Sequence, residues 1–101
     1  MKSPKHLKFI RSLPCLLCGE DTTVEAAHVR MSDARIAKPE TGIGRKPPDY
    51  FVVPLCGRHH RQQHEGSERE FWWCEQEPIL KALALYAVSG DYEAGLQIVK
   101  A

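Results

Sequence analysis

Two short cysteine and histidine pairs constrain the fold of this chain more than any other feature of its sequence. Cys15 and Cys18 form a CxxC pair, and Cys56 and His59 form a CxxH pair after a gap of 37 residues. Structural zinc sites draw four tetrahedral sulfur or nitrogen ligands as two close pairs from separate turns. A chain of 101 residues buries only a small core, so metal binding energy would contribute directly to its folding. The spacing therefore predicts a structural zinc site at these four residues.

The fourth zinc ligand has two alternatives. His60 follows His59 directly, and spacing alone does not decide which of them binds zinc. Cys74 is another alternative, although its place beside Trp72 and Trp73 favours a buried thiol that acts as a small apolar side chain. Two disulfides would be a different use of four cysteines, but the first residues lead into no apolar export signal, so metal ligation is the better interpretation.

The composition indicates one soluble globular domain, with 43% hydrophobic residues and a net charge of +1. No apolar run reaches the roughly 18 residues that a membrane helix needs, so we expect a cytoplasmic protein without a membrane partner. The charge is uneven along the chain. Residues 30–61 hold seven basic and three acidic side chains, whereas residues 62–101 hold seven acidic and three basic ones. The middle of the chain is the part that could face a polyanion, with simple solvation of these charges as the alternative.

The local patterns predict a small α+β fold. We expect a helix over residues 5–12, a strand over 22–29, a second strand over 50–53 that Pro54 ends, and a helix from about 57 to 64. Residues 31–49 are rich in proline and glycine and indicate a long irregular loop. Ser67 and Asp91 are expected to cap later helices. Between them, an apolar stripe predicts a further helix with Leu80, Leu83, Ala84 and Ala87 on its packed face.

A second metal site is indicated by three histidines. His60 and His64 are four residues apart and share one face of the predicted helix, where two imidazoles can bind one divalent ion. A strand pair packed on this helix would point His28, at the end of the first strand, towards them. Surface histidines at this spacing also occur by chance, and a lone histidine is more often a half-buried residue. The nearby pair of Cys56 and His59 and the basic residues within 30–61 favour the interpretation as a metal site.

A series of short motifs runs in fixed order through the middle of the chain. The motifs are Cys15-x-x-Cys18, Ala27-His28-Val29, Lys46-Pro47-Pro48-Asp49, Pro54-Leu55-Cys56-x-x-His59-His60 and His64. The series resembles the HNH endonuclease family, the ββα-metal nucleases, and is especially similar to short zinc-containing HNH proteins of phages and prophages, including the recombination-enhancement (Ref) type. The resemblance covers about half of the chain. It implies one domain over 1–101, with an HNH core over about 15–66 and a helical extension over about 67–101.

The resemblance also implies a function, the metal-dependent hydrolysis of DNA phosphodiester bonds. It makes His28 the general base that deprotonates the attacking water, a task that suits an imidazole. Asp49 becomes the structural counterpart of the family's middle asparagine, and His60 and His64 become ligands of a catalytic Mg²⁺ or similar divalent ion. The basic side chains that could add phosphate contacts are Arg30, Arg45, Lys46 and Arg61. DNA is the implied partner, with recombination proteins as further candidates.

Two positions depart from the family pattern. Ala27 stands where many members have an aspartate or histidine that also binds the catalytic ion, so the ion would rely on water and phosphate. His59 stands where a cysteine is commoner. Ala27 motivates an alternative function, a zinc-stapled DNA-binding or recombination accessory module that lacks strong catalysis. A third alternative is a protein-interaction domain with Trp72 and Trp73 as anchors on its acidic helices.

Overall fold

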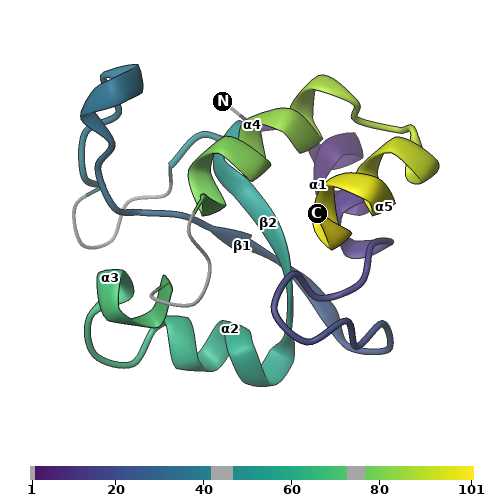
Figure 1. Ribbon diagram of the computed structural model, residues 1–101, viewed down its shortest axis with the longest axis horizontal. Helices are drawn as coiled ribbons and strands as arrows, with labels where there is room; N and C mark the ends of the chain where they lie inside the picture. The colour runs from purple at the N-terminus through teal and green to yellow at the C-terminus, as the bar shows by residue number, and fades with distance from the viewer. Residues whose placement is uncertain (1, 42–46, 73–76) are drawn as a thin grey trace.

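An antiparallel pair of strands, β1 (Val24–His28) and β2 (Val52–Cys56), lies at the centre of the molecule. The computed structural model describes residues 2–41, 47–72 and 77–101 (Figure 1). The α-helices in these ranges are α1 (Pro4–Arg11), α2 (Gly57–Gln63), α3 (Glu68–Phe71), α4 (Pro78–Ala87) and α5 (Tyr92–Lys100). Helices α2 and α3 lie on one side of the strands, and α1, α4 and α5 lie on the other (Figure 1). The predicted α+β class is confirmed.

The register of the strand pair decides what lies at each of its ends. Val24 pairs with Cys56, and His28 pairs with Val52. His28 therefore lies next to the 3₁₀ turn η2 (Asp49–Phe51) that leads into β2. Helix α2 starts at the opposite end, directly after β2, and contacts both strands. Its seven residues extend about 10 Å, against about 16 Å for the five-residue strands, so α2 brings its last turn back towards His28.

The second strand begins and ends later than predicted. Residues 50 and 51 belong to the 3₁₀ turn η2, and Pro54, which was expected to end the strand, lies inside it opposite Ala26. Within a strand, the N–H and C=O groups of one residue point to the same side. The Pro54 carbonyl accepts a hydrogen bond from the Leu16 amide at 2.9 Å, on the side away from β1. The missing N–H of Pro54 therefore removes no hydrogen bond between the strands.

Helix α1 covers the strands with one apolar face. It begins with Pro4 in its first turn and buries His6, Phe9 and Ile10. The imidazole of His6 is fully enclosed, and this burial lowers its pKa below the ordinary value. Helix α5 packs tightly on α1 at Gly95, where an added Cβ would lie 2.8 Å from a ring carbon of Phe9. A side chain at this position would push the two helices apart.

Two further predictions need correction. Helix α4 buries Ile79, Ala82 and Leu85, whereas Leu80, from the predicted stripe, is 40% exposed. The helix is apolar on most of its surface, so its sequence does not mark one face. The long loop is also partly regular, because a 3₁₀ turn, η1 (Ala34–Ile36), lies inside a bridge between Asp33 and Lys38. None of the described helices combines the length and apolar character that a bilayer crossing requires.

Trp72 belongs to the core. Only 4% of its surface is exposed, and its indole N–H donates to Glu68 Oε2 at 2.9 Å. It therefore does not provide the surface anchor that a protein-interaction domain would need. Trp73 and Cys74 lie outside the described residues.

Candidate functional site: a zinc knuckle and a histidine-lined cavity

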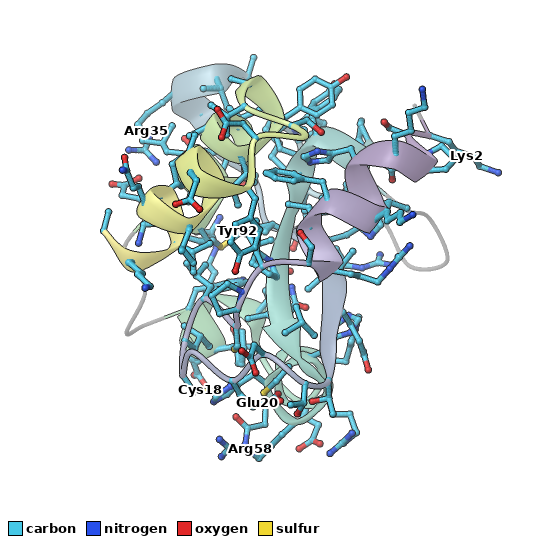
Figure 2. All side chains as sticks on the ribbon, turned by 90° about the vertical axis from the view of Figure 1, so that its right-hand side faces the viewer. Lys2, Cys18, Glu20, Arg35, Arg58 and Tyr92 are labelled. Carbon is cyan, nitrogen blue, oxygen red and sulfur yellow. The ribbon has the colours of Figure 1, made fainter. Side chains whose placement is uncertain are left out.

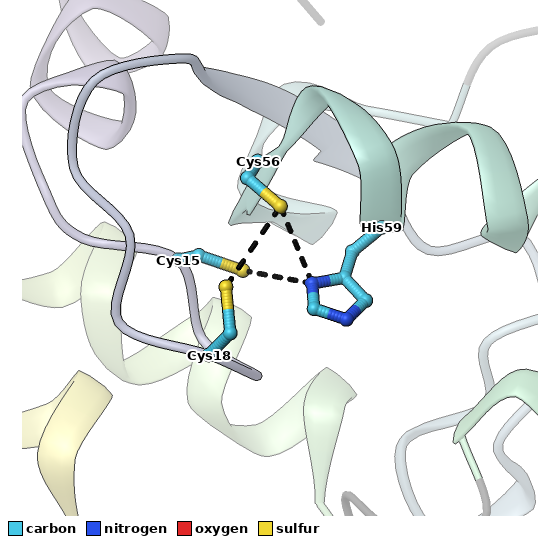
Figure 3. A group of neighbouring side chains, drawn as sticks. All are labelled: Cys15, Cys18, Cys56 and His59. Carbon is cyan, nitrogen blue, oxygen red and sulfur yellow. Dashed lines mark hydrogen bonds between the residues drawn. The ribbon is translucent and has the colours of Figure 1, made fainter.

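Cys15, Cys18, Cys56 and His59 converge on one point (Figure 3). Their ligand atoms all lie within 4.8 Å of one another. His59 Nδ1 is 3.3 Å from Cys56 Sγ and 3.5 Å from Cys15 Sγ, and Cys18 Sγ is 3.9 Å from Cys56 Sγ. Around a tetrahedral zinc ion, sulfur pairs are about 3.8 Å apart and sulfur–nitrogen pairs about 3.6 Å. The cluster can therefore hold a structural metal such as zinc.

The backbone around the first cysteine pair is shaped for this cluster. The Cys15 amide donates to the Glu20 carbonyl, and the Gly19 amide donates to the Cys15 carbonyl. Gly19 closes the turn with φ of 77°, a left-handed conformation that favours glycine. Cys18 is exposed at the same end of the molecule as Glu20 and Arg58 (Figure 2). The knuckle thus joins a surface turn to the buried end of β2.

The protonation of Cys15 and His59 suits a metal, whereas the pKa of the Cys18 thiol is above its ordinary value. A hydrogen bond with the Glu20 backbone lowers the pKa of Cys18, but burial and the neighbouring thiols of Cys15 and Cys56 raise it more. Burial raises the pKa of the Cys15 thiol, but hydrogen bonds from the backbone amides of Cys56, Cys18 and Leu17 lower it more, so its pKa is below the ordinary value. Burial, together with the charge of Arg58, lowers the pKa of His59. A thiolate and a neutral imidazole are the forms that bind metal ions.

The structure distinguishes the two adjacent histidines. His59 faces the three sulfur atoms, whereas His60 Nδ1 lies 2.6 Å from Glu25 Oε1 on the other side of the helix start. Among the described residues, His59 is therefore the fourth member of the cluster. The alternative fourth ligand, Cys74, lies outside those residues.

A separate cavity of about 300 Å³ brings His28, His60 and His64 together. It is lined by Leu7 and Arg11 of α1, Ala26 and His28 of β1, Arg30, and His60 and His64 of α2 and its C-terminal end. The predicted residues His28, His60 and His64 thus share one opening.

His60 and His64 bring two imidazole nitrogens close together. Their Nε2 atoms are 3.3 Å apart, and two nitrogen ligands of one ion are about 3.0–3.4 Å apart. Burial lowers the pKa of His64, and the charges of His60 and Arg30 lower it further, which favours the neutral form. Glu25 accepts a hydrogen bond at His60 Nδ1, so the lone pair of a neutral His60 lies on Nε2. The donor set therefore fits a divalent cation.

His28 is held by Asp49 on the other wall of the cavity. Asp49 Oδ1 is 2.9 Å from His28 Nε2, and Asp49 Oδ2 accepts a hydrogen bond from the Ser3 amide at 2.5 Å. Burial raises the pKa of this carboxyl group, but the contacts with His28 and Ser3 lower it more, so its pKa is below the ordinary value and Asp49 is charged. A neutral His28 that donates from Nε2 keeps its lone pair on Nδ1.

The predicted basic residues are distributed unevenly around this cavity. Arg30 lines it, whereas Arg61 is exposed on α2 and is not one of its lining residues. Arg45 and Lys46 lie outside the described residues. Ala27 is fully buried and supplies no ligand atom beside His28.

Sequence reasoning missed two residues of the site. Glu25 reaches His60 because the strand register puts the start of β1 beside Gly57, whose missing side chain leaves room for the Glu25 carboxylate. Arg11 enters the cavity from α1, which precedes all of the recognised motifs. Glu25 had a usable local signal, because it is an acidic residue only three positions before His28. Arg11 had no comparable signal, because its placement depends on how α1 packs.

Comparisons with known proteins provide few functional clues. A family model described as protein of unknown function (DUF968) matches residues 1–82. The uncharacterized protein YdfU of Escherichia coli (strain K12) is 32% identical over 60 residues, which cover 59% of this chain and 15% of that relative. No solved structure matches the chain significantly.

Proposed function

The chain belongs to the DUF968 family, whose function is unknown, and we propose that it is a metal-dependent endonuclease of the HNH type that hydrolyses DNA phosphodiester bonds. The observation that carries this proposal is the cavity where His28, backed by Asp49, faces the same opening as the His60 and His64 pair. The order of elements also supports it, since an antiparallel strand pair is followed directly by a helix that carries two histidines.

The chemistry follows from the groups that line the cavity. His28 takes a proton from water at Nδ1 while the water oxygen bonds to phosphorus and the bond from phosphorus to the leaving oxygen breaks. Asp49 holds the imidazole in the required orientation and stabilises its protonated form. A divalent ion bound by His60 and His64 would neutralise charge on the phosphate and on the leaving oxygen. Arg11 and Arg30 would bind the phosphates on either side without reading the base sequence.

Cleavage of supercoiled plasmid by the zinc-loaded chain tests the proposal. Nicked or linear product is expected with Mg²⁺ or Mn²⁺, and none with EDTA. A reaction that proceeds equally with and without added divalent ions would contradict a metal-dependent mechanism. The zinc content must be measured in parallel, because EDTA can also remove the ion from the knuckle.

A second candidate function is supported by Ala27. Because this buried residue offers no ligand atom, the ion at His60 and His64 would have few protein ligands. The alternative is an accessory module that binds DNA or a recombination protein without strong catalysis. Salt-dependent DNA binding with no cleavage under any divalent ion would favour this module over the nuclease.

Replacing Glu25 with glutamine is expected to weaken Mn²⁺ binding at the His60 and His64 pair about 10- to 100-fold, because the carboxylate fixes the tautomer of His60. Glu65→Gln is the matched control, since Glu65 is exposed, follows His64 and carries the same charge. Mn²⁺ affinity can be measured by electron paramagnetic resonance on zinc-loaded protein. Equal losses in both variants would show that only the overall charge matters.

Replacing Arg11 with alanine is expected to lower DNA affinity and to reduce the slope of log K against log salt by about 0.9, the contribution of one phosphate contact. Lys8→Ala is the control, because Lys8 is an exposed cation in the same turn of α1 but does not line the cavity. Fluorescence anisotropy at several salt concentrations measures both slopes. An unchanged slope for Arg11→Ala would remove this residue from the phosphate contacts.

A further inference from the structure

Glu68 receives hydrogen bonds from two other parts of the molecule and from the end of its own helix. It is the first residue of α3, and its two carboxylate oxygens are each 3.1 Å from the Arg30 amide nitrogen. Its Oε2 atom also accepts from Gln63 Nε2 at 2.9 Å and from Trp72 Nε1 at 2.9 Å. Hydrogen bonds to a charged acceptor are roughly twice as strong as neutral ones. Glu68 thus joins α3 to the end of β1 and to the end of α2.

Gln63 extends this network to the histidines. Its amide nitrogen donates both to Glu68 Oε2 and to the backbone carbonyl of His28, each at 2.9 Å. Both acceptors lack hydrogen atoms, so the amide group of Gln63 can take only this orientation. The buried Gln63 Oε1 is left without a partner among the described residues. The Gln63 side chain therefore links His28 to Glu68.

The network connects the two walls of the histidine-lined cavity. Gln63 immediately precedes His64, and Arg30 lies two residues after His28. One carboxylate therefore holds the backbone just beyond His28 and the helix turn that carries His64. We propose that Glu68 is a positioning residue that sets the placement of His28 relative to the His60 and His64 pair. This inference rests on the proposed nuclease function for its kinetic consequence, but the placement of the imidazoles can be tested without cleavage.

Glu68→Gln is the direct test, because it keeps the size of the side chain while replacing one acceptor oxygen with an NH₂ group that faces other donors. The turnover number kcat for plasmid cleavage is expected to fall about 10- to 100-fold with KM changed by less than about twofold, as for misplaced catalytic groups. Glu70→Gln, an exposed acid of the same helix, should behave like the wild-type chain. A change confined to KM would contradict a positioning role.

Imidazole NMR signals decide the inference independently of activity. In Glu68→Gln, the ring signals of His28 and His64 are expected to shift, while those of His6, buried on α1, remain in place. If this variant does not fold, Gln63→Met is expected to shift the same two rings, because it removes the hydrogen bonds to the His28 carbonyl and to Glu68 Oε2 while the Glu68 contacts with Arg30 and Trp72 remain. Unmoved His28 and His64 signals in a folded variant would overturn the role of Glu68. A wild-type chain that fails to cleave DNA would instead count against the nuclease, and the ring signals would still decide the role of Glu68.

Discussion

Removal of the metal from the Cys15, Cys18, Cys56 and His59 cluster is expected to unfold the chain. Structural zinc contributes on the order of 10 kcal/mol to small domains, and whole domains of this size are stable by about 5–15 kcal/mol. Cys56 ends β2 and immediately precedes α2 as its N-cap, so loss of its ligand bond would release both the strand pair and the helix. Cys56→Ser should therefore show little cooperative melting by circular dichroism and bind less than one zinc ion per chain.

Three single substitutions identify the ligands of this cluster. His59→Ala should lose zinc affinity, whereas His60→Ala should keep one zinc ion per chain and a normal melting temperature, since His60 faces Glu25. Cys74→Ser should also keep the ion, because the cluster is complete without that residue. Loss of zinc in His60→Ala but not in His59→Ala would reverse the assignment of the two histidines.

The cluster of Cys15, Cys18, Cys56 and His59 was predictable because its signals are local. CxxC and CxxH spacings place each ligand pair on one turn, and only the meeting of the two turns needs a tertiary fold. The choice of His59 over His60 needed the structure, because adjacent residues on a helix point in different directions that depend on where the helix starts. Helix α2 begins at Gly57, which turns His59 towards the sulfur atoms and His60 towards Glu25.

Features that depend on long-range packing were not predictable. Pro54 looks like a strand end from its sequence, and only the Leu16 contact shows why β2 tolerates it. The packed face of α4 was misassigned because apolar residues surround most of that helix, so burial against the strands rather than the pattern chooses Ile79 and Leu85. Glu68 had no predicted role, because its contacts with Arg30 and Gln63 arise when α3 folds back.

The histidine-lined cavity was predictable in part. The spacing of His60 and His64 predicted that they could share an ion, and the 3.3 Å between their Nε2 atoms agrees with that geometry. His28 approaches the His60 and His64 pair because of the antiparallel register of β1 and β2. The sequence predicted the two strands but not their register. The contact between His28 and Asp49 depends on the η2 turn, which no local signal predicted.

Replacing His28 with alanine is expected to lower kcat for DNA cleavage by about 10²- to 10⁴-fold, the usual contribution of a general base. The substitution removes the proton acceptor but leaves the His60 and His64 pair, Arg11 and Arg30 in place. Mn²⁺ affinity, DNA affinity and zinc content should therefore stay close to the wild-type values. Single-turnover cleavage measured at saturating metal and DNA separates the loss of chemistry from a loss of binding.

The pH dependence of the residual reaction distinguishes a general base from a residue that only supports the fold. With His28 present, the rate should rise with deprotonation of one group and then level off. In His28→Ala, hydroxide from solution has to replace the imidazole, so the logarithm of the rate should continue to rise with pH. Partial recovery of cleavage by His28→Ala on adding imidazole would also indicate that His28 is the general base, because the space left by the side chain can admit a free base. Equal cleavage by both proteins at every pH would instead exclude His28 as the base and leave the proposed metal site at His60 and His64 without its assigned partner.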